Sequence, residues 1–131
     1  KLRIVPCGLY DPCLHTITLA KVGDRYRVEV LERQGLAKVQ RRWRAEVSAQ
    51  EVENYLSRLK QATVPAFPVS PLVCDGEYVE LTVEGELSTL TLGWWTIAPE
   101  GADAFAVFSD WMRRLAFGDE DASADDVGEP C

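Results

Sequence analysis

Residues 77–115 contain two runs in which apolar and polar side chains alternate, followed by a run with apolar side chains at helical spacing. This order constrains the fold more than any other feature of the sequence. Residues 77–83 and 87–95 alternate apolar with polar or aromatic side chains, the two-residue period of a half-buried strand. The apolar positions are Val79, Leu81, Val83, Leu90, Leu92 and Trp94. The short Gly-containing link between the runs predicts a hairpin. Phe105, Phe108, Met112 and Leu115 follow at helical spacing, so we expect a helix to cover the hairpin's apolar side.

The amino-terminal half predicts more strands. Residues 2–5 are apolar and end at Pro6, as in an edge strand or a leader. Residues 15–22 and 25–31 alternate on either side of Gly23-Asp24, which is typical of a two-residue hairpin turn. A further strand is expected over residues 36–47. One face of it would carry Ala37, Val39, Trp43 and Ala45, and the other Lys38, Gln40, Arg42 and Arg44.

A first helix is expected after Ser48. Ser48 and Glu51 have the spacing of a capping box, in which the hydroxyl accepts from an early helical N–H and the carboxylate reaches back to the cap's own N–H. The residues expected to be buried are Val52, Tyr55, Leu56 and Leu59. Three prolines in residues 65–71 then exclude further helix, and Gly118 ends the second helix.

These elements predict an α+β fold with an antiparallel sheet of about five strands and two helices on one face. The order is three or four strands, a helix, two strands and a helix, and we take βββ-α-ββ-α as the prediction. Residues 1–117 form the expected single domain, followed by an acidic, disordered tail over residues 118–131.

Charge is distributed unevenly along the chain. Six acids without a base in residues 119–129 account for six of the seven net negative charges. Residues 73–112 contain eight acids and no Lys or Arg, whereas residues 25–44 are rich in arginine. If the basic strands lay beside the acidic hairpin, cross-strand pairs would neutralise much of both.

Four cysteines permit disulfides in an oxidising compartment, or buried free thiols otherwise. The disulfide candidates are Cys7, Cys13 and Cys74, with the pairing left open. Disulfides would place the protein outside the cytoplasm, as in the periplasm, and their absence would place it in the cytoplasm. Cys7, Cys13, His15 and Cys74 lack the paired spacing of structural zinc sites, so no metal is expected.

Catalytic chemistry has little support. His15 is the only histidine, and a nucleophilic site would have to combine it with Cys7 or Cys13. No nucleotide-binding or zinc-hydrolase motif occurs, so we expect neither a cofactor nor an enzyme. The basic run 38–44 is better explained as a solvated strand face than as a nucleic-acid site. No segment is apolar enough to span a membrane, and no signal peptide is recognised.

The order of features resembles known domains. A Gly-Asp hairpin, a Ser-x-x-Glu helix with Leu56 and Leu59, an Asp75-Gly before two strands, Trp-Trp, Pro99 and an aromatic helix resemble several families of uncharacterised bacterial α+β domains. The region around Cys7, Pro12 and Cys13 resembles the cysteine-rich start of one such family. In size and character, the chain is also similar in type to the immunity proteins of bacterial toxin systems. The resemblance implies a bacterial α+β domain without an assigned activity.

The functional prediction is a non-enzymatic binding protein, most concretely an immunity-type inhibitor of a toxin with a basic surface. Trp94 and Trp95 point to opposite faces of their strand, so Trp95 is either an exposed anchor or covered by the loop that follows. The predicted partner-binding residues are Asp75, Glu77, Glu80, Glu84, Glu86, Trp95 and Glu100. The alternative is an extracytoplasmic accessory or structural domain held by disulfides.

Overall fold

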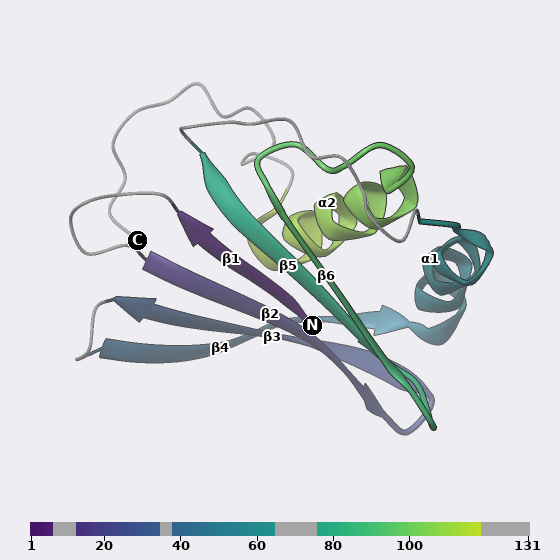
Figure 1. Cartoon of the computed structure of the whole chain (residues 1–131). Helices are drawn as coiled ribbons and strands as arrows, with labels where there is room; N and C mark the ends of the chain where they lie inside the picture. The colour runs from purple at the N-terminus through teal and green to yellow at the C-terminus, as the bar shows by residue number, and fades with distance from the viewer. Residues whose placement is uncertain (7–12, 35–37, 65–75, 119–131) are drawn as a thin grey trace.

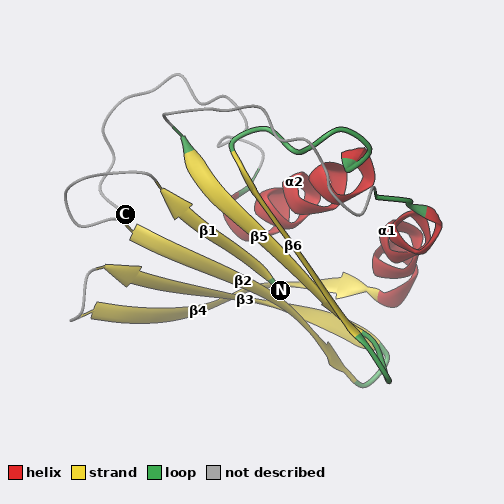
Figure 2. Ribbon diagram, viewed as in Figure 1, coloured by secondary structure: helices red, strands yellow, loops and turns green. Residues whose placement is uncertain are grey.

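A six-stranded antiparallel sheet carries both helices on one face. The computed structural model describes residues 1–6, 13–34, 38–64 and 76–118. Within them the chain forms β1 (Leu2–Pro6), β2 (Cys13–Val22), β3 (Arg25–Gln34), β4 (Lys38–Ser48), α1 (Ala49–Gln61), β5 (Glu77–Glu84), β6 (Thr89–Trp95) and α2 (Asp103–Phe117). The strand order is β4-β3-β2-β1-β5-β6, and Figure 2 shows the helices together behind the sheet. The α+β prediction is confirmed, although four strands, not three, precede α1.

β1 lies in the middle of the sheet (Figure 1). Leu2 is aligned with Ile17 of β2 on one side and with Leu81 of β5 on the other. The expectation of an edge strand or a leader was therefore wrong. This short strand joins the meander β2-β3-β4 to the hairpin β5-β6, and Leu2 and Ile4 are buried in the core.

A bulge in the β3-β4 pair changes which residues of β4 face the helices. Val28 is aligned with Ala45, but the next residue, Glu29, is aligned with Trp43, so one residue of β4 is left over. Beyond the bulge, Arg42 is aligned with the buried Val30. Arg42 therefore faces the helices, and its predicted place on the opposite, solvated face was wrong.

The core lies between the inner face of the sheet and α2. Its strand residues include Ile17, Val28, Val30, Val79, Leu81 and Trp94, all at most 5% exposed. From α2, Phe105, Phe108 and Met112 are buried, and Leu115 is half-buried against the cluster. The predicted helical stripe is buried as expected, but α2 comes closest to β2, β3 and β4, so it covers more of the sheet than the hairpin.

α1 begins and packs as expected in outline. The Ser48 hydroxyl accepts a hydrogen bond from the Glu51 N–H at 3.3 Å. The Glu51 carboxylate instead accepts from the Trp111 indole N–H, with 3.1 Å between Oε1 and Nε1. Tyr55 stacks on Trp111 with ring centroids 4.1 Å apart. The reciprocal half of the capping box is thus replaced by a bond between the two helices, and Val52 is buried below it.

The turns follow local sequence. Gly23 and Asp24 link β2 to β3, with Gly23 at a φ of 66° as a tight hairpin turn requires. Gly118 ends α2 at a φ of 89°. Of the predicted tail over residues 118–131, Gly118 is described and residues 119–131 lie outside the described residues, so the tail and the single-domain boundary stay predictions. No helix of the described residues has the length and apolar character needed to cross a bilayer.

Candidate functional site

The predicted acidic residues divide between the two faces of the sheet. Glu77 lies on the inner face with Val79 and Leu81, where it forms an ion pair with Arg113 of α2. Glu80 and Glu84 alternate to the outer face, which the helices leave uncovered. Glu86 lies in the hairpin turn. The hairpin thus separates residues that the prediction had grouped together.

Glu100 lies in the connection between β6 and α2, away from the strands of the hairpin. Asp75 lies outside the described residues. The sheet therefore leaves Glu80 and Glu84, with Trp95, as the predicted partner-binding residues that share one face.

Trp95 is an exposed aromatic on the outer face. Trp94 is 5% exposed and faces the core, whereas Trp95 is 46% exposed. The Trp95 ring lies against Tyr78, its aligned neighbour on β5, with centroids 5.3 Å apart. Of the two predicted alternatives, an exposed Trp95 is the one found, and its role as an anchor stays a prediction. The contact with Tyr78 holds the indole in place without covering it.

The same outer face carries further apolar side chains. Val5 of β1 is aligned with Tyr78, which continues the row that begins at Trp95. Leu14 and Leu31, from β2 and β3, alternate to this face and are half-buried like Val5. The outer face therefore offers a partly apolar strip with its largest exposed side chain at the β6 end.

Most bases of the outer face lie far from the acidic hairpin, although Arg3 of β1 is aligned with Glu80 of β5. Glu80, Glu84, Glu86 and Glu100 form no ion pair within the described part of the chain. The arginines of β3 and Glu46 of β4 lie across the sheet, separated from β5 by β2 and β1. The basic strands β3 and β4 therefore do not lie beside the acidic hairpin, and the condition for cross-strand neutralisation between them is not met.

A charged cluster, which sequence reasoning missed, lies on the inner face beside the last turn of α2. It comprises His15, Glu32, Arg42, Glu77 and Arg113. Glu32 is buried and forms an ion pair with Arg42, while His15 Nε2 lies 3.9 Å from Glu32 Oε1. We name this set the inner charged cluster. A signal was available, because Glu32 shares the alternation of Val28 and Val30, and Glu77 that of Val79 and Leu81.

His15 is held in its neutral form. Burial is the largest cause that lowers the pKa of His15 below 6.5, and the positive charge of Arg42 acts in the same direction. Glu77 opposes this shift and Arg113 adds to it. The Phe117 ring packs edge-on against the imidazole, with centroids 5.2 Å apart. The environment therefore favours a neutral imidazole at pH 7.

The surroundings of His15 do not supply a nucleophile. Cys13 Sγ lies 3.6 Å from His15 Nε2, but Cys13 is disulfide-bonded and so has no thiolate. The other disulfide candidates, Cys7 and Cys74, lie outside the described residues. No group of three or more His, Cys, Asp or Glu side chains among residues 1–6, 13–34, 38–64 and 76–118 could hold a metal ion.

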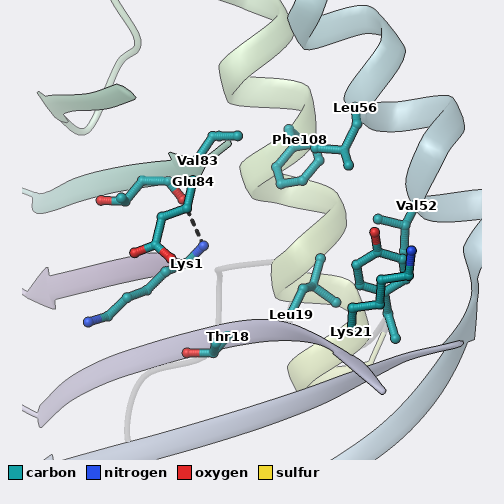
Figure 3. A pocket seen from close by; sticks show the side chains of 11 residues that line it. Lys1, Thr18, Leu19, Lys21, Val52, Leu56, Val83, Glu84 and Phe108 are labelled. Carbon is teal, nitrogen blue, oxygen red and sulfur yellow. Dashed lines mark hydrogen bonds between the residues drawn. The ribbon is translucent and has the colours of Figure 1, made fainter. Parts of the chain in front are cut away.

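A cavity of about 350 Å³ opens where β2 and β5 run past the start of β1 (Figure 3). In this view Phe108 and Leu56 come from the two helices, while Leu19 and Val83 come from the flanking strands. Lys21 and Glu84 also line it. The walls are mainly aliphatic and aromatic, which suits apolar contact more than proton transfer.

Three comparisons with known proteins found no match for this chain. No protein-family model, curated protein or solved structure matches it. The resemblance to bacterial α+β domain families and to immunity proteins therefore stays a prediction.

Proposed function

We propose that this protein is a non-enzymatic binding protein that docks a basic protein partner on the outer face of its sheet, at the β5-β6 side. The observation that carries the proposal is the exposed Trp95, packed against the half-buried Tyr78 on the face that neither helix covers. Aromatic residues of this kind are enriched among those that dominate binding energy at interfaces.

The charge around this pair defines the partner. Glu80 and Glu84 lie on the same face and form no ion pair within the described residues. Exposed carboxylates attract a surface rich in Lys and Arg and speed its encounter, while burial of Trp95 slows release. Arg3, aligned with Glu80, and the amino-terminal ammonium group near Glu84 offset part of this charge. An immunity-type inhibitor that covers a basic toxin surface fits this chemistry and is the finer form of the proposal.

A binding measurement tests it. Wild-type protein should retain a basic protein from its native source at a ratio near one to one. Trp95→Ala should weaken that complex by about thirtyfold or more, the scale of a truncated interface anchor. Glu80→Lys should slow association, with the effect decreasing as salt is added. Val107→Ala is the matched control, because Val107 is an exposed apolar residue on α2, 43% exposed.

Two results would count against the proposal. One is the absence of any stoichiometric partner, which would favour the alternative of an accessory or structural domain, for which the disulfide at Cys13 is the supporting observation. The other is a partner whose affinity is lowered as much by Val107→Ala as by Trp95→Ala.

A further inference from the structure

β6 is an edge strand without the features that usually prevent edge-to-edge pairing. It ends the sheet, and residues 87–98 contain no charged side chain and no proline. Four of the six exposed large apolar residues of the described chain belong to β6 or its flanks: Leu87, Leu90, Trp95 and Ile97. An edge of this kind is a template for another strand.

The opposite edge is protected. β4 reads KVQRRWRAEVS, with five charged residues in eleven positions, and its pairing with β3 contains a bulge. Charges and bulges are the usual means by which edge strands avoid association. The two edges of the same sheet therefore differ, and the unprotected one is β6.

The backbone of β6 has hydrogen-bonding groups that point outward. Gly85 N–H donates to Ser88 C=O, and Thr96 N–H donates to Glu77 C=O, each at 2.8 Å. In an antiparallel pair, every second residue exchanges backbone hydrogen bonds with the partner strand. These two bonds therefore show that Leu90, Leu92 and Trp94 bond to β5. The N–H and C=O groups of Thr91 and Gly93 consequently face away from the sheet and are available to a further strand.

The residues around Leu92 are partly symmetric along the chain, and Thr89 opposite Trp95 is the clearest exception. Counting outward from Leu92, Leu87 corresponds to Ile97, Ser88 to Thr96, Leu90 to Trp94 and Thr91 to Gly93. In an antiparallel pair of two identical strands centred on Leu92, those of these residues that lie within β6, Thr89–Trp95, are opposite each other. The outward groups of Thr91 then bond those of Gly93, and the exposed Leu90 meets Trp94 of the second copy. Leu87 and Ile97 lie beyond the strand, where Thr96 has a φ of 49°.

We propose that two copies of this chain associate by antiparallel pairing of their β6 strands about Leu92, so that the two sheets become one. A second copy is the occupant because the edge is self-complementary under a two-fold axis, as an isologous interface requires. The absence of charge along residues 87–98 also keeps like charges out of the strand pair, although the chain carries a net charge of -7.

The test is the mass of the full chain in solution, without any partner, measured by sedimentation equilibrium from about 1 µM to several hundred µM, a range that brackets a micromolar dissociation constant. Wild type should be a dimer at the upper end. Leu90→Lys should weaken dimerisation at least tenfold, because the ammonium group enters the strand pair. Val107→Lys should leave it unchanged, since it adds the same group at a similarly exposed apolar site, 43% against 52% exposed.

A backbone variant separates pairing from side-chain contact. Thr91→Pro removes an outward N–H but no backbone bond to β5, and should weaken the dimer. Thr91→Val keeps that N–H and should not weaken it, and both variants lose the hydrogen bond between the Thr91 and Thr82 hydroxyls, so their difference reports the N–H alone. A wild-type monomer at every concentration would overturn the inference. So would a dimer that tolerates Leu90→Lys and Thr91→Pro but is lost with Trp95→Ala, since that dimer would use the outer face.

The inference and the proposed function can fail separately. Dimerisation is measured on the isolated chain and depends on the β6 edge, whereas partner binding depends on the outer face. In the dimer the two outer faces adjoin, so each partner-binding surface would be duplicated on one continuous sheet.

Discussion

The bond between Glu51 of α1 and Trp111 of α2 gives the sharpest stability prediction. Trp111 is 3% exposed, and its indole N–H donates to Glu51 Oε1 at 3.1 Å. Glu51→Ala would leave a buried donor without its acceptor, at a cost of about 1–3 kcal/mol. It would also remove a carboxylate from the first turn of α1, where a negative charge interacts favourably with the helix dipole, and this loss adds about 0.3–1 kcal/mol to the cost. The higher helix propensity of alanine offsets a few tenths of a kcal/mol of this loss of stability.

We therefore expect Glu51→Ala to lower the free energy of unfolding by about 1–3 kcal/mol, measured by urea denaturation. Glu51→Gln keeps an acceptor oxygen and should lose less. Glu53→Ala is the matched control, since it makes the same change two residues away on an exposed position, and should change stability by less than about 0.5 kcal/mol.

A double-mutant cycle with Trp111→Phe isolates the pair. If the bond joins the helices, the effects of the two substitutions on the free energy of unfolding should depart from additivity by at least about 0.5 kcal/mol. Strict additivity, together with equal effects of Glu51→Ala and Glu53→Ala, would refute this reasoning. Strict additivity with a larger loss for Glu51→Ala than for Glu53→Ala would instead restore the local capping box as the role of Glu51.

Two predictions concern the inner charged cluster. Because the folded pKa of His15 is lowered below its unfolded value of about 6.5, the unfolded chain binds the proton first and stability falls as the pH drops from about 7 towards 5. His15→Gln should make the free energy of unfolding, measured by urea titration at pH 7, 6 and 5, depend less on pH. An unchanged pH dependence would contradict the lowered pKa of His15. Arg42→Ala should cost about 1–3 kcal/mol by the same assay, because it leaves the buried Glu32 carboxylate without its ion-pair partner. Arg25→Ala, which breaks an exposed pair, should cost less than about 1 kcal/mol, and equal losses would argue against burial as the cause.

Features set by neighbouring residues were predictable from sequence. The hairpin of residues 77–95, the stripe of α2 and the Ser48 cap depend on local periodicity and capping chemistry, and the structure contains all three. The same alternation predicted that Trp94 and Trp95 lie on opposite faces of the sheet. What covers each face did not, because it depends on where the helices pack.

Features set by distant residues were not predictable. The place of β1 depends on its pairing with β5, which is far away in sequence and leaves no local signal. The bulge opposite Val28 reverses the alternation of β4, so a strict two-residue period assigned Arg42 to the wrong face. Glu51 was assigned to its nearest donor because the competing donor, Trp111, lies on another helix.

The central position of β1 has a consequence for how the chain folds. Leu2 is aligned with Leu81, so one flank of the middle strand stays unpaired until residues about eighty positions later become available. At typical rates of translation the delay is about 4–16 s. Contacts of such long sequence separation slow folding. During that interval the meander β2-β3-β4 can form with β1 as a temporary edge, and the hairpin β5-β6 completes the sheet last.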